Sequence, residues 1–585
     1  MRSARIVTVA HVLLFPLLLA ECATVPEQPN IVVVLTDDQG WGDLSVHGNR
    51  NLATPRIDSL ARDGAQVQHF YVSPVCSPTR AELLTGRYHP RGGVYGTSAR
   101  AERLDLDERT IAETFRAAGY ATGAFGKWHN GTQYPYHPNA RGFDEFYGFT
   151  SGHWARYFDP PLDHNGRMVR GKGFIADDLT DHALDFIERN RSRRFFCYIP
   201  LNTPHSPMQV PDRFYEKFAK ADLPLRYDGH EAEDIAHTRA ALAMVENVDW
   251  NVGRILDRLE VLGLTSDTVV VFLSDNGPAS WRWNGGLKGR KGTLDEGGIR
   301  VPFMIRWPGR IPAGRKIPQI AAAIDVLPTL ADMAGIPVVG EKPLDGRSLK
   351  PLLLGTAAGW PERKLYAYWR DGVSVRTERY RLDTTGRLFD LVADSGQRTD
   401  VAGAHPRIAL ELRQAAEAMH RELTAELGQD YRPLPVGGAP LTELPAADGV
   451  ASGGVERSNR YPNSSYFRNW TSTDAALTWD IEVVNSGEYD VTIYYACPAP
   501  DIGSTLELSF LGRQTTARVT DAHDPPLVGA DDDRVPRIES YDKDFKPMSL
   551  GTLRLEKGRG ALALRAVHIP GTQAVEISRL VVNRR

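Results

Sequence analysis

One cysteine in this chain stands where a sulfur could be chemically active. The segment 75–81 reads VCSPTRA, so Cys76 is followed by Pro78 and, about one helical turn on, by Arg80. The proline and the helix-compatible residues after it predict a turn that opens a helix. A thiol at a helix N-terminus near a guanidinium can have a lowered pKa, and the same place can bind an anion. The simpler interpretation is a buried structural cysteine beside a proline that starts a helix.

Oxygen ligands follow two apolar segments at matching positions. The segments NIVVVLT at 30–36 and TVVVFL at 268–273 are typical of strands buried on both faces, and the ligand pairs after them are Asp37–Asp38 and Asp275–Asn276. Ligands bind at the carboxyl ends of strands in open α/β sheets, so neighbouring strands would bring three carboxylates and one amide together. These carboxylates repel one another unless a hard cation, Ca²⁺ or Mg²⁺, binds them in an all-oxygen shell. Alternatively, each pair only caps the turn or helix that follows it.

Cationic side chains are spread over several predicted loops. They are Arg80, Lys127, His129, His205 and, in the Gly-rich segment 285–298, Lys288, Arg290 and Lys291. Each alone fits a solvated loop residue or a hydrogen-bonded histidine. Three of these loops, however, follow predicted strands of one sheet. A metal and several cations at one sheet edge would form a site for a tetrahedral oxyanion, such as a phosphate or sulfate ester.

The elements that must position these residues alternate between strand and helix. Beyond the two strands above, strands are predicted at 121–125, 194–201 and 301–307, and helices at 54–64, 109–118, 177–191, 234–262 and 324–334. This alternation predicts an α/β domain over 28–363, with a mixed, mostly parallel sheet flanked by helices.

Two smaller units are predicted after this domain. The first, over 364–430, is a small antiparallel subdomain with strands and one helix at 365–370, 372–377, 380–383, 388–391 and 406–427. The segment 431–448 is rich in proline, glycine and alanine, which is a linker composition. Strand-like segments without helices then predict a separate all-β sandwich over 449–585.

Composition and charge argue against one class of partner. The chain has 585 residues, with 69 Lys and Arg against 73 Asp and Glu, and a net charge of −4. This balance predicts no nucleic-acid partner. The four cysteines show no disulfide-framework spacing, so the fold is expected to rest on its core; they are Cys22, Cys76, Cys197 and Cys497.

Residues 1–23 predict export. Arg2 and Arg5 precede an apolar run at 6–20, the pattern of a signal peptide, with a buried core helix as the alternative. The run is short for a membrane span. Cys22 is a candidate lipid-anchor site, although Glu21 replaces the small residue usual before such a cysteine. We therefore expect a periplasmic, secreted or lipid-anchored protein, with membrane contact only through that anchor.

The ordered motifs carry a family resemblance. The signature CSPTR at 76–80, followed by LTGR at 84–87, resembles that of the type I, formylglycine-dependent sulfatases of the alkaline phosphatase superfamily. Further similar segments, in family order over about 28–430, are Asp37–Asp38, GKWH at 126–129, GFD at 142–144, TPH at 203–205, SDNG at 274–277, KGT at 291–293, EGG at 296–298 and LFDL at 388–391. Asn130 departs from the family's leucine. The resemblance implies an alkaline-phosphatase-like fold and an arylsulfatase-like sulfuric ester hydrolase.

The resemblance also implies roles for individual residues. In that family a separate maturation enzyme oxidises the signature cysteine, here Cys76, to Cα-formylglycine, and one hydroxyl of its hydrate is the nucleophile. The implied ligands of calcium, which is preferred over magnesium, are Asp37, Asp38, Cys76 in its modified form, Asp275 and Asn276. The implied catalytic positions are Arg80 and Lys127, which hold the diol, His129, its base, and His205 and Lys291, which bind sulfate and assist the leaving alcohol.

A gem-diol suits sulfate ester hydrolysis better than a simple hydroxyl or thiol. A serine or cysteine that attacked sulfur would be left as a stable sulfo-ester, whereas the second hydroxyl of a diol can be deprotonated to expel sulfate and restore the aldehyde. The cations matter because ester cleavage builds negative charge on the leaving oxygen. On this hypothesis Cys76 is a precursor and not a thiol nucleophile.

The substrate is expected to be a sulfated carbohydrate. The segment 143–166 combines aromatic residues with His153, His164 and Asn165, which suits stacking on sugar rings, although packing into the core explains the aromatics equally well. The same two interpretations apply to the sandwich aromatics, which are Trp470, Trp479, Tyr494 and Tyr495. Two other functions fit the motifs: a phosphonate or phosphodiester hydrolase of the same superfamily, and a catalytically silent glycan-binding homologue.

Overall fold

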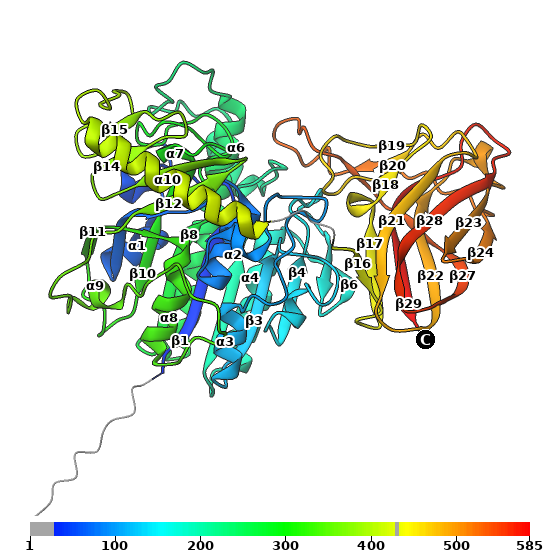
Figure 1. The fold of residues 1–585 in the computed structure, drawn as a ribbon, viewed down its shortest axis with the longest axis horizontal. Coiled ribbons are helices and arrows are strands. Elements are labelled where there is room, and N and C mark those ends of the chain that lie inside the picture. The colour runs from blue at the N-terminus through cyan, green and yellow to red at the C-terminus, as the bar shows by residue number, and fades with distance from the viewer. Residues whose placement is uncertain (1–27, 428–431) are drawn as a thin grey trace, which may run out of the picture.

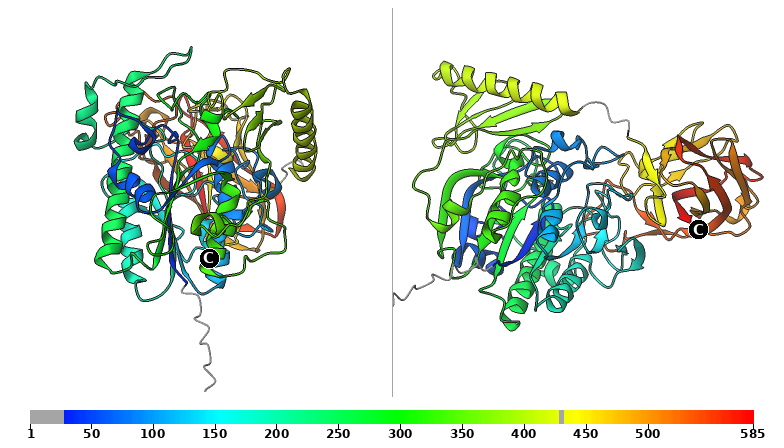
Figure 2. Two further views of the ribbon diagram at one scale, coloured as in Figure 1. Left: turned by 90° about the vertical axis from the view of Figure 1, so that its left-hand side faces the viewer. Right: turned by 60° about the horizontal axis from the view of Figure 1, so that its bottom comes forward.

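The computed structural model of the protein describes residues 28–427 and 432–585. The predicted signal peptide at 1–23, including Cys22, lies outside the described residues. Figure 1 and Figure 2 show an α/β body, a small sheet with one long helix packed on it, and an all-β sandwich beside the body. None of the described helices combines the length and apolar character that a membrane crossing needs.

The central strand of the body is β1 (Asn30–Thr36), which lies between β7 (Phe195–Pro200) and β8 (Thr268–Ser274) and is parallel to both. The full strand order is β11-β2-β10-β8-β1-β7-β3-β4-β5-β6, with β9 beside β2. The other strands of this sheet are β2 (Ala65–Tyr71), β3 (Ala121–Lys127), β4 (Glu145–Phe149), β5 (Pro161–His164), β6 (Arg167–Arg170), β9 (Arg300–Val301), β10 (Phe303–Arg306) and β11 (Arg315–Ala322).

The sheet is mixed, and the prediction of a mostly parallel sheet is wrong at its flanks. Parallel pairing runs from β8 through β1, β7 and β3 to β4, and joins β11 to β2. By contrast, β10 is antiparallel to β8 and β2, and β4, β5 and β6 are antiparallel in turn. β5 and β6 form a hairpin, which pairs antiparallel. The connection from β8 to β9 and β10, residues 275–299, contains only the one-turn helix α7 (Glu296–Ile299) and not the crossover helix typical of parallel neighbours.

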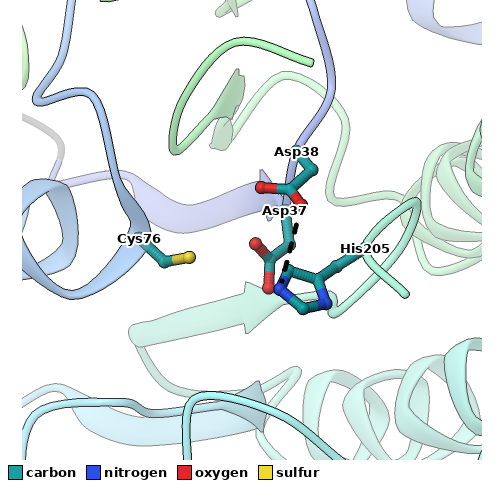
Figure 3. Close-up of side chains that lie close together, drawn as sticks. All are labelled: Asp37, Asp38, Cys76 and His205. Atoms are coloured by element: carbon teal, nitrogen blue, oxygen red, sulfur yellow. Dashed lines mark ion pairs between the residues drawn. The ribbon is translucent and has the colours of Figure 1, made fainter. Parts of the chain in front are cut away.

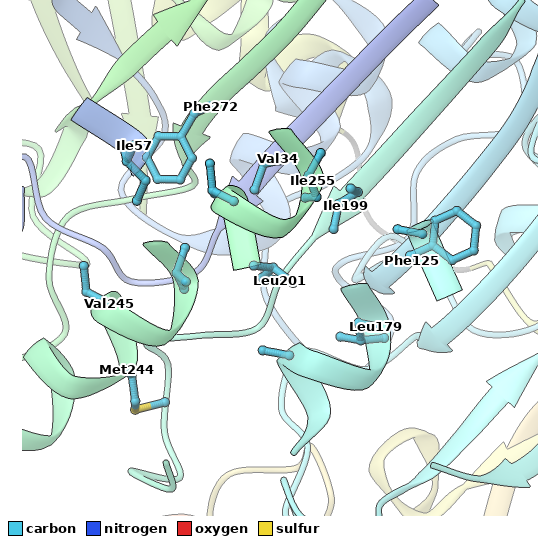
Figure 4. Packing of buried hydrophobic residues seen from close by; sticks show 14 of the residues in the cluster. Val34, Ile57, Phe125, Leu179, Ile199, Leu201, Met244, Val245, Ile255 and Phe272 are labelled. Carbon is cyan, nitrogen blue, oxygen red and sulfur yellow. The ribbon is translucent and has the colours of Figure 1, made fainter. Parts of the chain in front are cut away.

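Side chains of β1 alternate between two apolar cores. Val32 and Val34 belong to the core under one set of helices, and Ile31, Val33 and Leu35 to the core on the other face. Figure 4 shows the first core, in which Val34 and Phe272 face residues of α1, α4 and α6. Its helices are α1 (Pro55–Arg62), α4 (Ile175–Arg189), α5 (Asp212–Ala219) and α6 (Ile235–Val261); the other face carries α2 (Cys76–Thr85), α3 (Ile111–Ala117), α8 (Val326–Ala334) and α9 (Lys350–Leu354).

The small antiparallel sheet packs one face on α10 (Pro406–Leu427). Its strands, in order, are β12 (Leu365–Trp369), β13 (Gly372–Arg376), β14 (Tyr380–Leu382) and β15 (Leu388–Asp390). A buried ion pair joins this sheet to the body, since Arg381 Nη1 lies 3.0 Å from Glu296 Oε1.

The segment predicted as a linker, 431–448, contributes strands to the sandwich. β16 (Leu434–Val436) pairs with β21 (Ala476–Val483), and β17 (Leu441–Pro445) pairs with β29 (Glu576–Arg584). Leu434, Val436 and Leu444 are fully buried in the sandwich core. Burial of these apolar side chains makes the segment part of the sandwich despite its prolines and glycines. The linker interpretation therefore differs from the structure.

Two sheets form the sandwich, in the orders β16-β21-β28-β23-β24 and β19-β20-β29-β22-β27. Apart from the strands already given, they contain β18 (Val450–Ala451), β19 (Glu456–Arg457), β20 (Phe467–Arg468), β22 (Gly487–Ala496), β23 (Thr505–Phe510), β24 (Arg513–Arg518), β27 (Lys546–Leu555) and β28 (Gly558–His568). A separate short ribbon, β25 (Leu527–Val528) with β26 (Asp542–Lys543), extends from the sandwich.

Candidate active site

The two oxygen-ligand pairs lie side by side because β1 and β8 are neighbours in register. Thr36 pairs with Ser274, so the residues after them leave the sheet together. Asp38 N donates to Asp275 Oδ1 at 3.2 Å, and Asn276 Nδ2 donates to Asp38 Oδ1 at 2.7 Å. The side chains of both pairs, Asp37–Asp38 and Asp275–Asn276, are buried. The predicted convergence of three carboxylates and one amide is therefore present.

Cys76 faces this group from the start of α2. Its sulfur, one carboxylate oxygen each of Asp37 and Asp38, and a ring nitrogen of His205 all lie within 4.8 Å of one another. Figure 3 shows Asp37 and Asp38, from the end of one strand, facing Cys76 and His205, which come from two other segments. The cysteine therefore lies beside the carboxylates. The strand before it, β2, is not a neighbour of β8, because β10 lies between them in the sheet.

The donor set fits a hard cation. Asp37 Oδ1 and Asn276 Oδ1 are buried and have no hydrogen-bond partner. Unpartnered buried oxygens are costly, and carboxylate and amide oxygens are the ligands that Ca²⁺ and Mg²⁺ prefer. Burial raises the pKa of Asp275 to about 7, and the charge of Asp37 adds to this effect, so a cation here would relieve repulsion among the carboxylates.

Three cationic residues surround the carboxylates. The fully buried Arg80 donates from Nε and Nη2 to Asp275 Oδ2 at 3.2 and 2.9 Å. Lys127 Nζ lies 2.5 Å from Asp37 Oδ2, and Lys291 Nζ lies 2.6 Å from Asp38 Oδ1. Burial alone would raise the pKa of Asp37, but Lys127, His205 and Arg80 outweigh it and hold this pKa well below its usual range.

The thiol of Cys76 is not activated. Arg80, which the sequence placed near the sulfur, makes its hydrogen bonds to Asp275 and to the carbonyl of Lys127. Burial raises the pKa of Cys76 to about 12, and Asp37 adds to this effect. The lowered thiol pKa expected for this position is therefore not found, because burial and the charge of Asp37 outweigh the opposite effects of Lys127 and Lys291.

His129 is held as a neutral base. It follows β3 with φ of 65°, in the left-handed region. Its Nε2 must carry a proton, because Nε2 lies 2.8 Å from the carbonyl oxygen of Thr97, which can only accept. Nδ1 is buried without a partner, and burial together with Lys127 puts the pKa of His129 well below its usual range. The ring therefore keeps a free lone pair on Nδ1.

His205 is held in a similar way after β7. Its Nδ1 donates to the carbonyl of Ser206 at 2.7 Å, and its Nε2 lies 3.8 Å from Asp38 Oδ2. Burial and Lys291 lower the pKa of His205, against the opposite effect of Asp38. Both histidines thus present one ring nitrogen to the site and anchor the other on backbone.

The Gly-rich segment places only Lys291 against the ligands. Lys288 Nζ pairs with Asp295 at 3.1 Å and lies over the ring of Phe389. Arg290 donates to the carbonyl of Ala279 and stacks on Trp281.

Three further buried polar residues lie at the site: Gln39, which the sequence analysis gave no role, and Asn130 and His153, which it named only as a departure from the family pattern and as a possible sugar contact. Asn130, the departure from the family pattern, donates to Ser77 beside Cys76 at 3.3 Å, so it braces the turn that carries the cysteine. The amide oxygen and nitrogen of the Gln39 side chain are buried and have no hydrogen-bond partner. The same is true of both ring nitrogens of His153, whose ring centroid lies 5.8 Å from that of His205. Asn130 and Gln39 directly follow motif residues, which is the signal that could have given them a role.

The aromatic residues expected near a sugar are mostly core. Phe143, Phe146 and Tyr157 are buried in the body, and Trp470 and Trp479 are fully buried in the sandwich. The packing alternative therefore describes these residues. Tyr494 is only partly buried and lies under Arg579.

The chain matches two family models. The model of the sulfatase family matches residues 29–336, more than half of the chain, and the model described as N-sulphoglucosamine sulphohydrolase, C-terminal, matches 290–421. The second match includes the small antiparallel sheet.

Curated relatives and solved structures agree with these matches. The chain is 34% identical to N-acetylgalactosamine-6-sulfatase of Mus musculus, over 57% of the chain and 67% of the relative, and 32% identical to arylsulfatase A of Homo sapiens, over 68% and 89%. It resembles the crystal structure of Ps i-CgsB in complex with k-i-k-neocarrahexaose, with a TM-score of 0.62 and 28% identity over 69% of the chain and 95% of that structure. The chain therefore belongs to the sulfatase family as an arylsulfatase-like member, an enzyme that hydrolyses sulfate esters.

Proposed function

We propose that the protein releases inorganic sulfate from a sulfated carbohydrate, with formylglycine made from Cys76 as its nucleophile and one calcium ion as its metal. The observation that carries this proposal is the position of Cys76. Its side chain meets Asp37, Asp38 and His205 at the carboxyl edge of the sheet, and its thiol has a raised pKa of about 12. A sulfur in this place is better explained as a precursor than as a thiolate.

Conversion of Cys76 replaces its –CH₂–SH by an aldehyde. The sulfur leaves, and the carbon is oxidised by two electrons; both steps belong to a separate maturation enzyme with its own oxidant. Addition of water to the aldehyde then gives a gem-diol. Asp37, Asp38, Asp275 and Asn276 would hold calcium, which supplies positive charge where the nucleophile and the sulfate group meet.

The first chemical step transfers the sulfo group to the diol. One hydroxyl oxygen of residue 76 forms a bond to sulfur and gives its proton to the free Nε2 of His205, while the bond from sulfur to the substrate oxygen breaks. His205, now charged, and Lys291 lie beside Asp38, where they can bind the sulfate oxygens and pass a proton to the leaving alcohol. Arg80 and Lys127 stabilise the charge that builds up at this edge.

The second step regenerates the aldehyde. His129 Nδ1, which is free of other hydrogen bonds, takes the proton of the remaining hydroxyl. The C–O bond to the sulfo group then breaks, sulfate leaves with that electron pair, and the carbonyl re-forms. The neutral state of His129, which its lowered pKa favours, is the state that this step needs.

A carbohydrate substrate is supported by relatives and by one side chain. N-acetylgalactosamine-6-sulfatases are among the similar proteins, and the similar structure of Ps i-CgsB is in complex with k-i-k-neocarrahexaose. His153 offers two buried, unpartnered ring nitrogens near His205, which suits hydrogen bonds to hydroxyl groups. We further propose export, as a periplasmic or secreted protein or as one anchored to a membrane by a lipid on Cys22.

Activity on paired substrates tests the proposal. We expect sulfate release from an aryl sulfate and from sulfated saccharides, and none after Cys76→Ala. Cys76→Ala and wild type should unfold at similar temperatures if the substitution removes only the nucleophile. The phosphonate monoester hydrolase of Agrobacterium radiobacter shares the fold at 22% identity and a TM-score of 0.53. Faster cleavage of an aryl phosphonate than of the aryl sulfate would therefore favour that alternative, and undiminished sulfatase activity in Cys76→Ala would contradict the proposed nucleophile.

A further inference from the structure

The carbonyl oxygen of Thr97 is held from two sides. His129 Nε2 lies 2.8 Å from it, and Asn463 Nδ2, from the loop between β19 and β20 of the sandwich, lies 3.0 Å from it. Gly152 packs against both nitrogens, since a Cβ at this position would overlap His129 Nε2 and crowd Asn463 Nδ2. A sandwich side chain is therefore one backbone carbonyl away from the imidazole proposed as base.

A second sandwich residue reaches the other histidine in the same manner. Ser206 accepts from His205 Nδ1 through its carbonyl oxygen at 2.7 Å, and its hydroxyl donates to Glu539 Oε1 at 2.6 Å. Glu539 lies in the segment between β25 and β26. Each histidine is thus hydrogen-bonded to a backbone carbonyl, and each of those two residues is held by a side chain from the sandwich.

Charged and backbone contacts hold the sandwich against the body around these two points. Arg156 Nη2 lies 2.8 Å from Asp544 Oδ1, and Arg537 donates to the carbonyl oxygen of Ala155. On the loop after Ser206, the backbone N–H of Arg534 donates to the carbonyl of Met208 at 2.9 Å. Hydrogen bonds that involve a charged partner are the stronger and more directional ones, so the interface has a defined geometry.

We propose that the C-terminal sandwich is a positioning element of the active site, in which Asn463 and Glu539 hold Thr97 and Ser206, the two residues whose carbonyl oxygens orient His129 and His205. This inference rests on the proposed roles of the two histidines. Groups that fix the second nitrogen of a functional histidine set its tautomer and its orientation. Here the sandwich, which follows the family-matched residues 29–421 in the chain, contributes to fixing those nitrogens.

Substitutions in the full-length protein test the inference. Asn463→Leu keeps the side-chain volume and removes the donor, and Glu539→Ala removes the acceptor for Ser206. We expect kcat for sulfate release to fall about tenfold in each variant, which corresponds to about 1.4 kcal/mol in the activation free energy. KM and Tm should stay near the wild-type values, because orientation of the histidines affects the chemical step more than binding.

Two matched controls separate positioning from general stability. Asn485→Leu likewise removes an amide donor of the sandwich, but Asn485 donates to the carbonyl of Gly437 within the sandwich at 2.8 Å. Asp544→Ala removes an interdomain ion pair that touches neither histidine. Both controls should keep wild-type kcat.

The outcomes can be told apart. The inference is overturned if Asn463→Leu and Glu539→Ala have the same kcat as the controls. It is also overturned if Asp544→Ala lowers kcat as much as they do and lowers Tm as well. Should one variant fail to fold, the other still decides. A wild-type protein that releases no sulfate contradicts the proposed function itself, whereas an active wild type with unaffected variants contradicts only the role of the sandwich.

Discussion

At the scale of single residues, the chemistry depends on which buried atoms have no partner. Asp37 Oδ1, Asn276 Oδ1 and His129 Nδ1 are buried and make no hydrogen bond within the protein. Buried polar atoms normally have a hydrogen-bond partner, so a group of buried atoms without one indicates a place where a ligand binds them. These three atoms are the ones that the proposed cation and diol require.

His129→Ala should separate the two chemical steps. Removing the base that acts on the remaining hydroxyl leaves transfer of the sulfo group possible and slows its release, by about 10²- to 10⁴-fold on general grounds. We expect a burst of alcohol that approaches one per active site, followed by slow turnover, in rapid-mixing experiments with an aryl sulfate. A steady rate without a burst, reduced to the same extent, would instead place His129 in the first step.

Glu82, within α2, should make stability depend on pH. Burial raises the pKa of Glu82 to about 8, although it accepts a hydrogen bond from Ser73 Oγ at 3.0 Å. Glu82 is therefore protonated in the folded state up to about this pH, while in the unfolded chain it ionises above its ordinary value of 4.5. The unfolded state then binds fewer protons, and stability falls as pH rises from about 4.5 through about 8.

Glu82→Gln should remove this pH dependence. We expect its free energy of unfolding, relative to wild type, to increase by a few kcal/mol between pH 5 and pH 8, because one pKa unit corresponds to about 1.4 kcal/mol. Urea unfolding at the two pH values measures it. The exposed Glu417→Gln serves as control. A constant difference between Glu82→Gln and wild type across this range would show that Glu82 is ionised in the fold.

At the scale of elements, the site is a consequence of strand order. β1 and β8 bring the carboxylates together, β3 leads to Lys127 and His129, and β7 leads to His205. The sequence predicted the bounds of β1 and placed ligands at strand ends, because these features are local. That β1 and β8 are neighbours in the sheet had to be assumed, because their pairing joins residues more than 230 positions apart in the chain.

Metal removal should loosen the carboxyl edge of β1 and β8. Without a cation, the buried carboxylates repel, and the unpartnered oxygens of Asp37 and Asn276 lack a ligand. Dialysis against a calcium chelator should abolish sulfate release and lower Tm, and added calcium should restore both; at 100 times Kd, binding contributes about 2.7 kcal/mol. A Tm that is indifferent to chelator and calcium would contradict the proposed metal site, and restoration by magnesium alone would change its identity.

Several strands could not be predicted from local pattern. β2 (AQVQHFY) and β29 (EISRLVVNR) mix charged or polar residues into their runs, and their partners in the fold supply the burial that makes them strands. The antiparallel flanks of the main sheet depend on the β5–β6 hairpin and on a connection from β8 to β10 that lacks a crossover helix, which composition does not reveal.

At the scale of the whole molecule, the sandwich is more closely joined to the body than the sequence suggested. The segment interpreted as a linker is built into both sandwich sheets through β16 and β17. Asn463 and Thr97, which meet beside His129, are 366 positions apart in the chain. No motif or spacing links such residues, so this part of the site was out of reach of sequence reasoning.

Leu444→Ala tests whether β17 is an integral strand. Leu444 is fully buried in the sandwich core, so its truncation should destabilise the sandwich by about 2–5 kcal/mol. Leu441, in the same strand, is 42% exposed, and Leu441→Ala should cost much less. Thermal unfolding of the two variants beside wild type measures the difference. Equal and small effects would support a flexible linker in place of the strand.

The mass of the peptide that contains residue 76 tests the central claim most directly. Digestion of active protein, produced together with the maturation enzyme, should yield this peptide with cysteine replaced by formylglycine, and an aldehyde reagent should label it. Protein produced without the maturation enzyme should carry the unmodified thiol and release little sulfate. An unmodified Cys76 in fully active protein would contradict the account.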